Sequence, residues 1–250
     1  MDRQNFSEMI DIHNHILPNV DDGAKSFEMS IKMLKHAHHQ GVTEIVNTIH
    51  YQHPLFMNID FSVQRLEKLK NSLQLKLNEL DIDLKIHLGC EVFYYDNLLK
   101  IKDEPFTTIG KGKFMLIEFS PNNIPNSQKQ TLFDLKMNGI TPIIAHPERY
   151  KKVQNDLNII FDWINAGCII QVDSGSVLGF LGKKAKDTSL EIIKENCCHV
   201  LASDAHNDTN RNFCIKKSYE IAKNIVGAEY AYRLVMEHPY SIIRGEDLYF

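Results

Sequence analysis

The sequence predicts an α/β fold, a distorted (β/α)7 barrel of the TIM-like kind, from three observations. Seven short β-rich apolar runs alternate with longer amphipathic segments, which is typical of parallel strands joined by right-handed crossovers. The length of 250 residues suits a barrel of this type. Metal-ligand residue types follow most of the runs, where a parallel barrel carries its active site, and they favour a barrel over an open doubly wound sheet.

The predicted strands are four to six residues long, as buried strands tend to be, and cover residues 9–12, 44–49, 84–88, 113–117, 141–145, 168–172 and 199–202. Ser26 caps the first predicted helix and Gly41 ends it, in keeping with the preferences of helix termini. The predicted helices cover residues 26–40, 61–80, 128–138, 157–166, 183–196 and 211–226, with one more near 229–237. Because no Pro-, Gly- or Ser-rich linker interrupts the pattern, we expect residues 1–250 to form a single domain.

The composition limits the class of protein. Hydrophobic and charged contents of 43% and 24% are those of a globular chain. The net charge of -4 and a pI near 6.3 argue against nucleic acid as the main partner. No apolar run approaches the ~18 residues of a membrane-spanning helix, and no leader peptide opens the chain, so we expect a cytoplasmic protein without membrane insertion. Five cysteines without a C-x-x-C pair indicate reduced thiols rather than a thiolate zinc site.

Histidine and carboxylate residues concentrate directly after the predicted strands. The chain has 12 histidines, a high count for one of the scarcer residue types. Six of the seven runs are followed by a His, Asp or Glu, and the acidic pair Asp21 and Asp22 lies in the first strand–helix loop. The candidates in these places are His13, His15, Asp22, His50, Glu91, Glu118, His146, Asp204 and His206.

The spacing of these residues predicts a metal centre. Strand side chains alternate with a period of two, so His13 and His15 project to the same side. Asp204 and His206 have the same spacing after another strand. A mixed nitrogen and oxygen set without thiolate suits Mn²⁺, Fe²⁺ or Zn²⁺. Nine candidates exceed the needs of one four-coordinate ion, so we expect two or three divalent ions bridged by carboxylates such as Glu91. Clusters of this kind hydrolyse phosphate esters.

Longer motifs surround these residues between positions 9 and 211: MIDIHNHILPNVDDGAKS, GVTEIVNTIH, GCEVFYYDNLL, FMLIEFS, GITPIIAHPERY, INAGCIIQVDSGSVLG and HVLASDAHNDTNR. In these motifs the chain resembles the polymerase-and-histidinol-phosphatase (PHP) superfamily. Within it, the chain is similar to the bacterial manganese-dependent tyrosine phosphatases of capsule and exopolysaccharide loci, the CpsB/YwqE type. DDG after H-x-H, together with IEFS, AHPERY and SDAHN, is specific to this branch, whereas H-x-H alone indicates only metal hydrolases in general.

The resemblance implies a seven-stranded PHP barrel with three metal ions, most often manganese, at the C-terminal ends of its strands. It implies one ion on His13, His15, Glu91 and Asp204, a second on Glu91, Glu118 and His146, and a third on Asp22, His50 and His206. By the same resemblance, Arg149 and Arg211 are catalytic residues that bind the substrate phosphate. The implied substrate is phosphotyrosine on a protein, with a bacterial tyrosine kinase of polysaccharide export as the expected partner. The sequence leaves the oligomeric state open, an oligomer included.

The sequence leaves other functions open. Hydrolysis of histidinol phosphate or another small phosphomonoester needs the same metals and is the main alternative. The acidic balance disfavours a DNA exonuclease, and the intact ligand set disfavours a non-catalytic binding module. No cysteine has an arginine six residues on, which disfavours a phosphocysteine mechanism.

The segment YQHPLF after His50 departs from the family pattern, and we interpret His53 as a loop histidine rather than a ligand.

Overall fold

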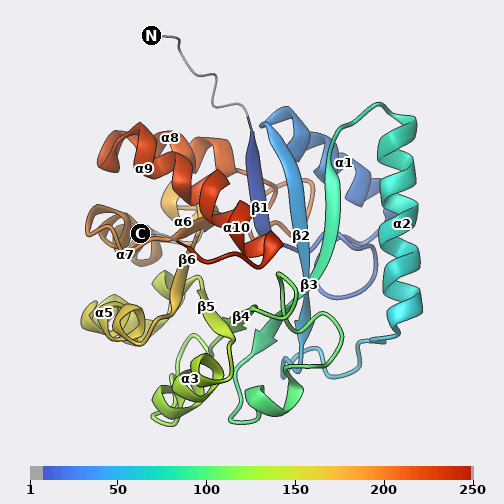
Figure 1. Ribbon diagram of the computed structural model, residues 1–250. Coiled ribbons are helices and arrows are strands. Elements are labelled where there is room, and N and C mark those ends of the chain that lie inside the picture. Colours follow the sequence, from blue (N-terminus) through green and yellow to red (C-terminus); the bar gives the residue numbers. More distant parts are fainter. Residues whose placement is uncertain (1–7, 249–250) are drawn as a thin grey trace.

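Within residues 8–248, the range that the computed structural model describes, seven parallel strands lie side by side in sequence order (Figure 1). They are β1 (Met9–Asn14), β2 (Val42–Tyr51), β3 (Lys85–Phe93), β4 (Phe114–Glu118), β5 (Thr141–Ala145), β6 (Ile169–Asp173) and β7 (Val200–Ala202). The ring closes where Asn14 forms a parallel bridge with Ala205, beyond β7, and the His15 amide donates to the Ala205 carbonyl over 2.8 Å. The predicted distorted (β/α)7 barrel is confirmed.

Part of the sequence prediction lies outside this range. The start of the chain, for which we expect no leader peptide, falls largely in residues 1–7, and these are not among the described residues. No helix between residues 8 and 248 is long and apolar enough to cross a membrane. The five cysteines are described, and each is a buried free thiol, as expected.

β2 and β3 extend further toward their C-terminal ends than their apolar runs predict. β2 continues to Tyr51 instead of residue 49, and β3 to Phe93 instead of residue 88. The two strands stay paired over this stretch, where His50 lies opposite Glu91. Backbone pairing, which a hydropathy pattern does not report, therefore sets these polar side chains next to each other.

Alternating strand side chains divide the core into two parts. Inward-facing residues such as Ile12, Val46 and Leu116 fill the inside of the barrel, and outward-facing residues form a larger cluster beneath the helices. The inner apolar filling ends at Leu116 on β4, and Glu118 follows on the same face. Apolar side chains thus fill the interior of the barrel, and polar side chains line its mouth, where the strands end.

The helices lie outside the ring (Figure 1). They are α1 (Phe27–His39), α2 (Val63–Glu79), α3 (Gln128–Met137), α4 (Lys151–Asn155), α5 (Asn158–Asn165), α6 (Ser174–Leu178), α7 (Lys183–Lys194), α8 (Ile215–Val226), α9 (Ala228–Tyr232) and α10 (His238–Arg244), with the short turns η1 (Leu98–Ile101), η2 (Pro147–Arg149) and η3 (Arg233–Glu237).

Two predicted helices differ from the observed ones. The helix predicted from residue 211 begins at Ile215, because the preceding loop folds back and the His206 amide donates to the Arg211 carbonyl over 2.7 Å. The helix predicted near 229–237 is α9 followed by the π-helical turn η3, and the chain then continues into α10. Pro239 lies in the first turn of α10 and is compatible with it, because the amides of a first turn have no acceptor within the helix.

Candidate metal centre

The nine candidate residues come from six strand ends and one loop, and they lie together at the mouth of the barrel. Their ligand atoms lie within 4.8 Å of one another in overlapping groups: His13, His15, Glu91 and Asp204; His15, Asp22, His50 and His206; Glu91, Glu118 and His146. All of these side chains except Asp22 and Glu118 belong to buried residues. The groups coincide with the three ligand sets implied by the family resemblance, with His15 shared between two of them.

Glu91 lies at the junction of the groups. Its Oε2 atom is 3.2 Å from His13 Nε2, 3.4 Å from His15 Nε2 and 3.3 Å from His50 Nδ1. Its other oxygen, Oε1, is 2.7 Å from Nε2 of His146. The two oxygens of one carboxylate thus face different imidazoles, which is the arrangement that a bridging ligand requires.

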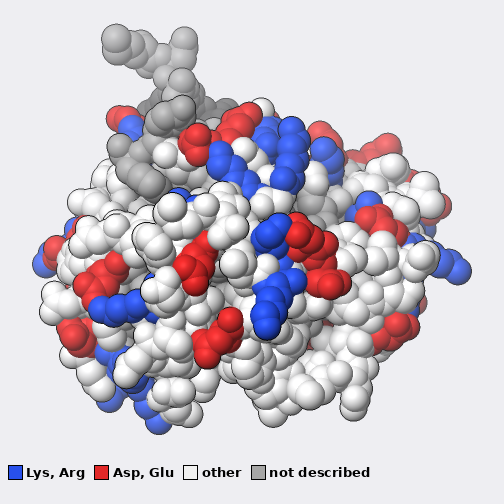
Figure 2. Space-filling model, turned by 60° about the horizontal axis from the view of Figure 1, so that its bottom comes forward, with Lys and Arg blue, Asp and Glu red and all other residues white. Residues whose placement is uncertain are grey.

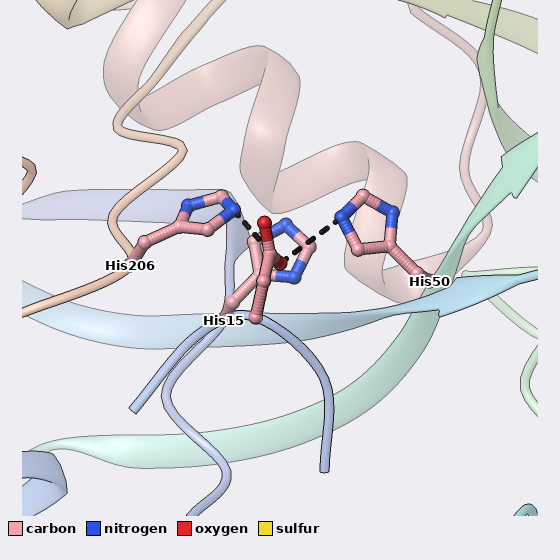
Figure 3. Close-up of side chains that lie close together, drawn as sticks. His15, His50 and His206 are labelled. Atoms are coloured by element: carbon pink, nitrogen blue, oxygen red, sulfur yellow. Dashed lines mark ion pairs between the residues drawn. The ribbon is translucent and has the colours of Figure 1, made fainter. Parts of the chain in front are cut away.

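Asp22 gathers a second set of rings. Figure 3 shows His15, His50 and His206 converging from three separate elements, and the Nε2 atoms of His50 and His206 each lie 3.3 Å from Oδ1 of Asp22. The ring centroids of His15 and His206 are 4.1 Å apart. Imidazoles this close around one carboxylate oxygen could surround a cation.

The burial of unpaired polar atoms tests whether the residues fit metal ions. Among residues 8–248, the buried atoms without a hydrogen-bond partner include Nε2 of His13 and His15, Nδ1 of His50, Oδ1 of Asp22 and Asp204, and Oε2 of Glu118. Buried polar atoms without partners are costly and rare in folded proteins. Six such atoms aimed into one small region fit a set of bound cations, and the nitrogen and oxygen donors suit divalent ions of the Mn²⁺, Fe²⁺ and Zn²⁺ class.

Hydrogen bonds to the far side of the imidazoles orient them. His15 Nδ1 donates to Oδ2 of Asp21 over 2.9 Å, and His13 Nδ1 donates to Oε1 of Gln171 over 2.8 Å. In both rings Nε2 is left facing the cluster, as in metal-binding histidines whose second nitrogen is held by an outer carboxylate or amide. The sequence prediction assigned no role to Asp21 or Gln171. Only the alternation of β6, which points Gln171 inward, could have indicated the latter.

Local backbone geometry supports the cluster. His146 and Asp204 have φ angles of 34° and 46°, in the left-handed region that residues other than glycine rarely adopt, and such strain is typical of functional sites. Gly23 of the DDG motif packs against the backbone of His15. A Cβ atom there would lie 2.1 Å from the His15 carbonyl oxygen, so this position requires glycine.

Two arginines adjoin the cluster through Asp204. Oδ1 of Asp204 lies 3.3 Å from His13 Nε2, while Oδ2 accepts from Nη2 of Arg211 over 2.9 Å and pairs with Nη2 of Arg149. Arg149 also pairs with Asp173 at the end of β6, a residue to which the sequence prediction gave no role. Burial opposes its charge, but Asp204 and Asp173 keep the pKa of Arg149 well above its ordinary value. The Arg149 guanidinium therefore stands charged beside the candidate ligands, and Arg211 pairs with the same oxygen of Asp204.

His53 lies in the loop that follows β2 and reaches the cluster from there. Its Nε2 atom lies 3.6 Å from Oε2 of Glu118, and it joins His50 and Glu118 in a further candidate group, which the sequence interpretation did not include. The Leu55 amide donates to His53 Nδ1 over 3.2 Å, which turns Nε2 toward the cluster. The chain bends at Gln52, whose φ is 48°, and the rings of His53 and Phe56 then each lie 4.8 Å from the ring of His50; the sequence carries no sign of this bend.

The carboxylates of the cluster repel one another. Burial opposes ionisation of Glu91, yet His13 and His50 hold its pKa well below the usual range. Burial and the negative charges of Glu91 and Asp204 raise the pKa of Glu118 well above its usual range. The protein's own histidines thus compensate only part of the negative charge, and cations would compensate the rest.

Residues 9–244 match the family described as capsular polysaccharide synthesis, CpsB/CapC. The chain belongs to the CpsB/CapC family. CapC of Staphylococcus aureus is 39% identical over 217 residues, which cover 86% of this chain and 84% of CapC. The tyrosine-protein phosphatase CpsB of Streptococcus pneumoniae is 34% identical over 246 residues, covering 95% and 99% of the two chains.

The fold of this family is also known from crystals. A chain from the crystal structures of YwqE from Bacillus subtilis and CpsB from Streptococcus pneumoniae, described as unique metal-dependent tyrosine phosphatases, superimposes with a TM-score of 0.88. It is 31% identical, and the match covers 96% of each chain. Membership in the CpsB/CapC family thus rests on nearly the whole chain and on its three-dimensional structure.

Proposed function

We propose that the protein is a metal-dependent phosphatase that removes phosphate from phosphotyrosine on proteins. The observation that carries the proposal is Asp204, whose two oxygens connect the candidate metal cluster with the pair Arg149 and Arg211. Cations on one side and guanidinium groups on the other would form a pocket for a phosphate dianion. Relatives along the length of the chain are tyrosine-protein phosphatases by name.

Each ion has a proposed set of ligands. We assign His13, His15, Glu91 and Asp204 to one, Glu91, Glu118 and His146 to a second, and Asp22, His50 and His206 to a third. Three divalent ions would exceed the negative charge of the four carboxylates, which leaves a net positive mouth for the substrate. We propose manganese as the metal, with iron or zinc as alternatives. The alternative number of bound ions is two. When bound, such ions lower the pKa of water and neutralise charge on the phosphoryl group.

The chain's own residues would bind and orient the phosphate. The planar guanidinium groups of Arg149 and Arg211 match the geometry of phosphoryl oxygens and would neutralise charge that develops there. Asp173 and Asp204 hold Arg149 in place before the substrate arrives. Gln171 and Asp21 fix the rings of His13 and His15, so that these would need little reorganisation.

The surface and the family suggest the partner. Figure 2 shows basic and acidic side chains interspersed with wide uncharged areas, without a dominant basic patch on the part of this face drawn for the described residues. A surface with such mixed charges suits a phosphorylated protein better than nucleic acid as the partner. We propose as substrate a tyrosine kinase of bacterial polysaccharide export, met in the cytoplasm.

The assay uses phosphotyrosine peptides and Mn²⁺. We expect phosphate release that chelation abolishes and Mn²⁺ restores, with kcat/KM for the peptide at least tenfold above that for histidinol phosphate. A higher kcat/KM for histidinol phosphate would replace the proposed substrate by the alternative one. No release from either substrate would contradict a phosphatase.

A further inference from the structure

A small aromatic cavity lies beside the metal cluster, and the proposed function has so far given it no role. It has a volume of about 200 Å³ and lies between the loops that follow β3 and β4. Phe93, Tyr95 and Phe119 belong to its lining, and Ser120, Asn123 and Asp96 add polar atoms. Phe119 and Ser120 follow Glu118 directly, so the cavity adjoins the cluster along the chain.

The strand geometry places the cavity one step outward from the candidate ligands. Phe93 lies opposite Glu118 in the pairing of β3 with β4. Side chains two residues apart on a strand share a face, so Phe93 follows Glu91 on the inner face of β3. At a rise of about 3.3 Å per residue, Phe93 lies about 7 Å further along the strand toward the mouth of the barrel. That span is of the size of a phenol ring, which separates the phosphate of phosphotyrosine from its peptide.

The walls of the cavity are partly fixed and partly open. Tyr94 stacks on Phe119 with ring centroids 4.8 Å apart, and its hydroxyl donates to Asp96 over 2.7 Å and lies 3.0 Å from the Thr131 hydroxyl. The rings of Phe93 and Tyr95 lie 5.6 Å apart and tilted, and Tyr95 is 43% exposed. A built floor with an exposed aromatic wall is suited to receive another ring.

A neighbouring contact ties the cavity to the cluster. His53 meets Phe93 edge to face at 5.0 Å, while its Nε2 lies 3.6 Å from Glu118. A larger cavity, of about 560 Å³, lies beneath the loop 54–60 and is lined by Asp21 and by aliphatic side chains such as Leu55 and Met57. Leu55 and Met57 are 81% and 76% exposed and offer no ring faces, and Phe56, which also lines this cavity, is already stacked on His50 with ring centroids 4.8 Å apart.

We propose that the cavity between Phe93, Tyr95 and Phe119 is the subsite for the phenol ring of the phosphotyrosyl substrate. This inference rests on the proposed function and names the determinant of its substrate class. An aryl phosphate would place its phosphate among the candidate ligands and arginines and its ring against Phe93 and Tyr95. A seryl phosphate lacks the ring and would leave these walls without a contact.

The test measures binding without turnover. The probes are a peptide carrying a non-hydrolysable phosphonate analogue of phosphotyrosine and inorganic phosphate alone, each titrated calorimetrically into Mn²⁺-loaded protein. We expect Tyr95→Ala and Phe93→Leu to weaken the aryl phosphonate about tenfold and to leave phosphate within about twofold. Tyr95→Phe keeps the ring and should bind like the wild type. Phe161→Ala removes a similarly exposed ring on α5 and is the matched control.

The outcomes separate the subsite from the function. Unchanged binding of the phosphonate in Tyr95→Ala and Phe93→Leu, or equal weakening of phosphate, would overturn the subsite and point to the cavity beneath loop 54–60. If Phe93→Leu fails to fold, Tyr95→Ala decides alone, since Tyr95 is 43% exposed and its removal leaves the core intact. Ring-dependent binding without hydrolysis of phosphotyrosine peptides would keep the subsite and remove the proposed function.

Discussion

The carboxylate of Asp173 pairs with the guanidinium of Arg149, and the nitrogen that makes this pair also contacts Asp204. Asp173 has a second task, because its Oδ1 caps the short helix α6 by accepting from the Gly175 amide over 2.6 Å. The end of β6, which lacks a candidate ligand, thus carries the residue that positions the phosphate-binding arginine.

Substituting Asp173→Asn should lower kcat on phosphotyrosine peptides about tenfold and leave KM within about twofold. Asparagine keeps the helix cap but loses the charge, so Arg149 stays charged and held only by Asp204. Steady-state kinetics measure the two constants separately. Asp187→Asn, on the exposed face of α7, is the control, and a wild-type kcat in Asp173→Asn would contradict the positioning role.

Glu148 should make the protein less stable as the pH rises toward 8. Burial and the charge of Asp173 raise the pKa of Glu148 to about 8, far above the ~4.3 of an exposed glutamate in the unfolded chain. The folded state therefore binds the extra proton, and its stabilising effect is lost as the pH passes through the folded pKa. Urea midpoints measured from pH 5 to 8 should fall more steeply in the wild type than in Glu148→Gln. Parallel profiles would show that Glu148 is not protonated in the fold.

Removing Asp22 should remove one metal ion and leave the others. Asp22 contacts His50 and His206 but lies outside the groups around Glu91 and Glu118. We expect elemental analysis of Asp22→Ala to show about one ion fewer per chain than the wild type. Asp103→Ala, whose side chain is 83% exposed, is the control. Loss of all ions, or of none, would contradict a separate third site.

Gln171→Leu should weaken the binding of Mn²⁺ about 10- to 100-fold, because outer hydrogen-bond partners orient metal-binding histidines. The substitution removes the acceptor for His13 Nδ1 and keeps a side chain of similar size. Competition with a chelator measures the affinity, with the exposed Gln130→Leu as the control. Wild-type affinity in Gln171→Leu would show that His13 needs no outer partner.

The sequence was sufficient for the barrel and for the gathering of the nine candidates, because strand ends in a parallel barrel must meet at one mouth. It was insufficient for residues whose role depends on a backbone turn or on a distant partner. Gln171 and Asp173 lie in the motif INAGCIIQVDSGSVLG, but nothing in it indicates their partners, His13 and Arg149, which come from other strand ends. His53 reaches the cluster after a bend at Gln52, where φ is 48°.

The most direct test is phosphate release from a phosphotyrosine peptide by protein stripped of metal and then supplied with Mn²⁺, in the wild type and in His13→Ala. We predict no release from the stripped protein, full recovery of the wild type with Mn²⁺, and at least a hundredfold lower rate in His13→Ala at the same Mn²⁺ concentration. Full activity in the stripped wild type, or equal recovery of His13→Ala, would contradict a metal-dependent phosphatase built on these residues.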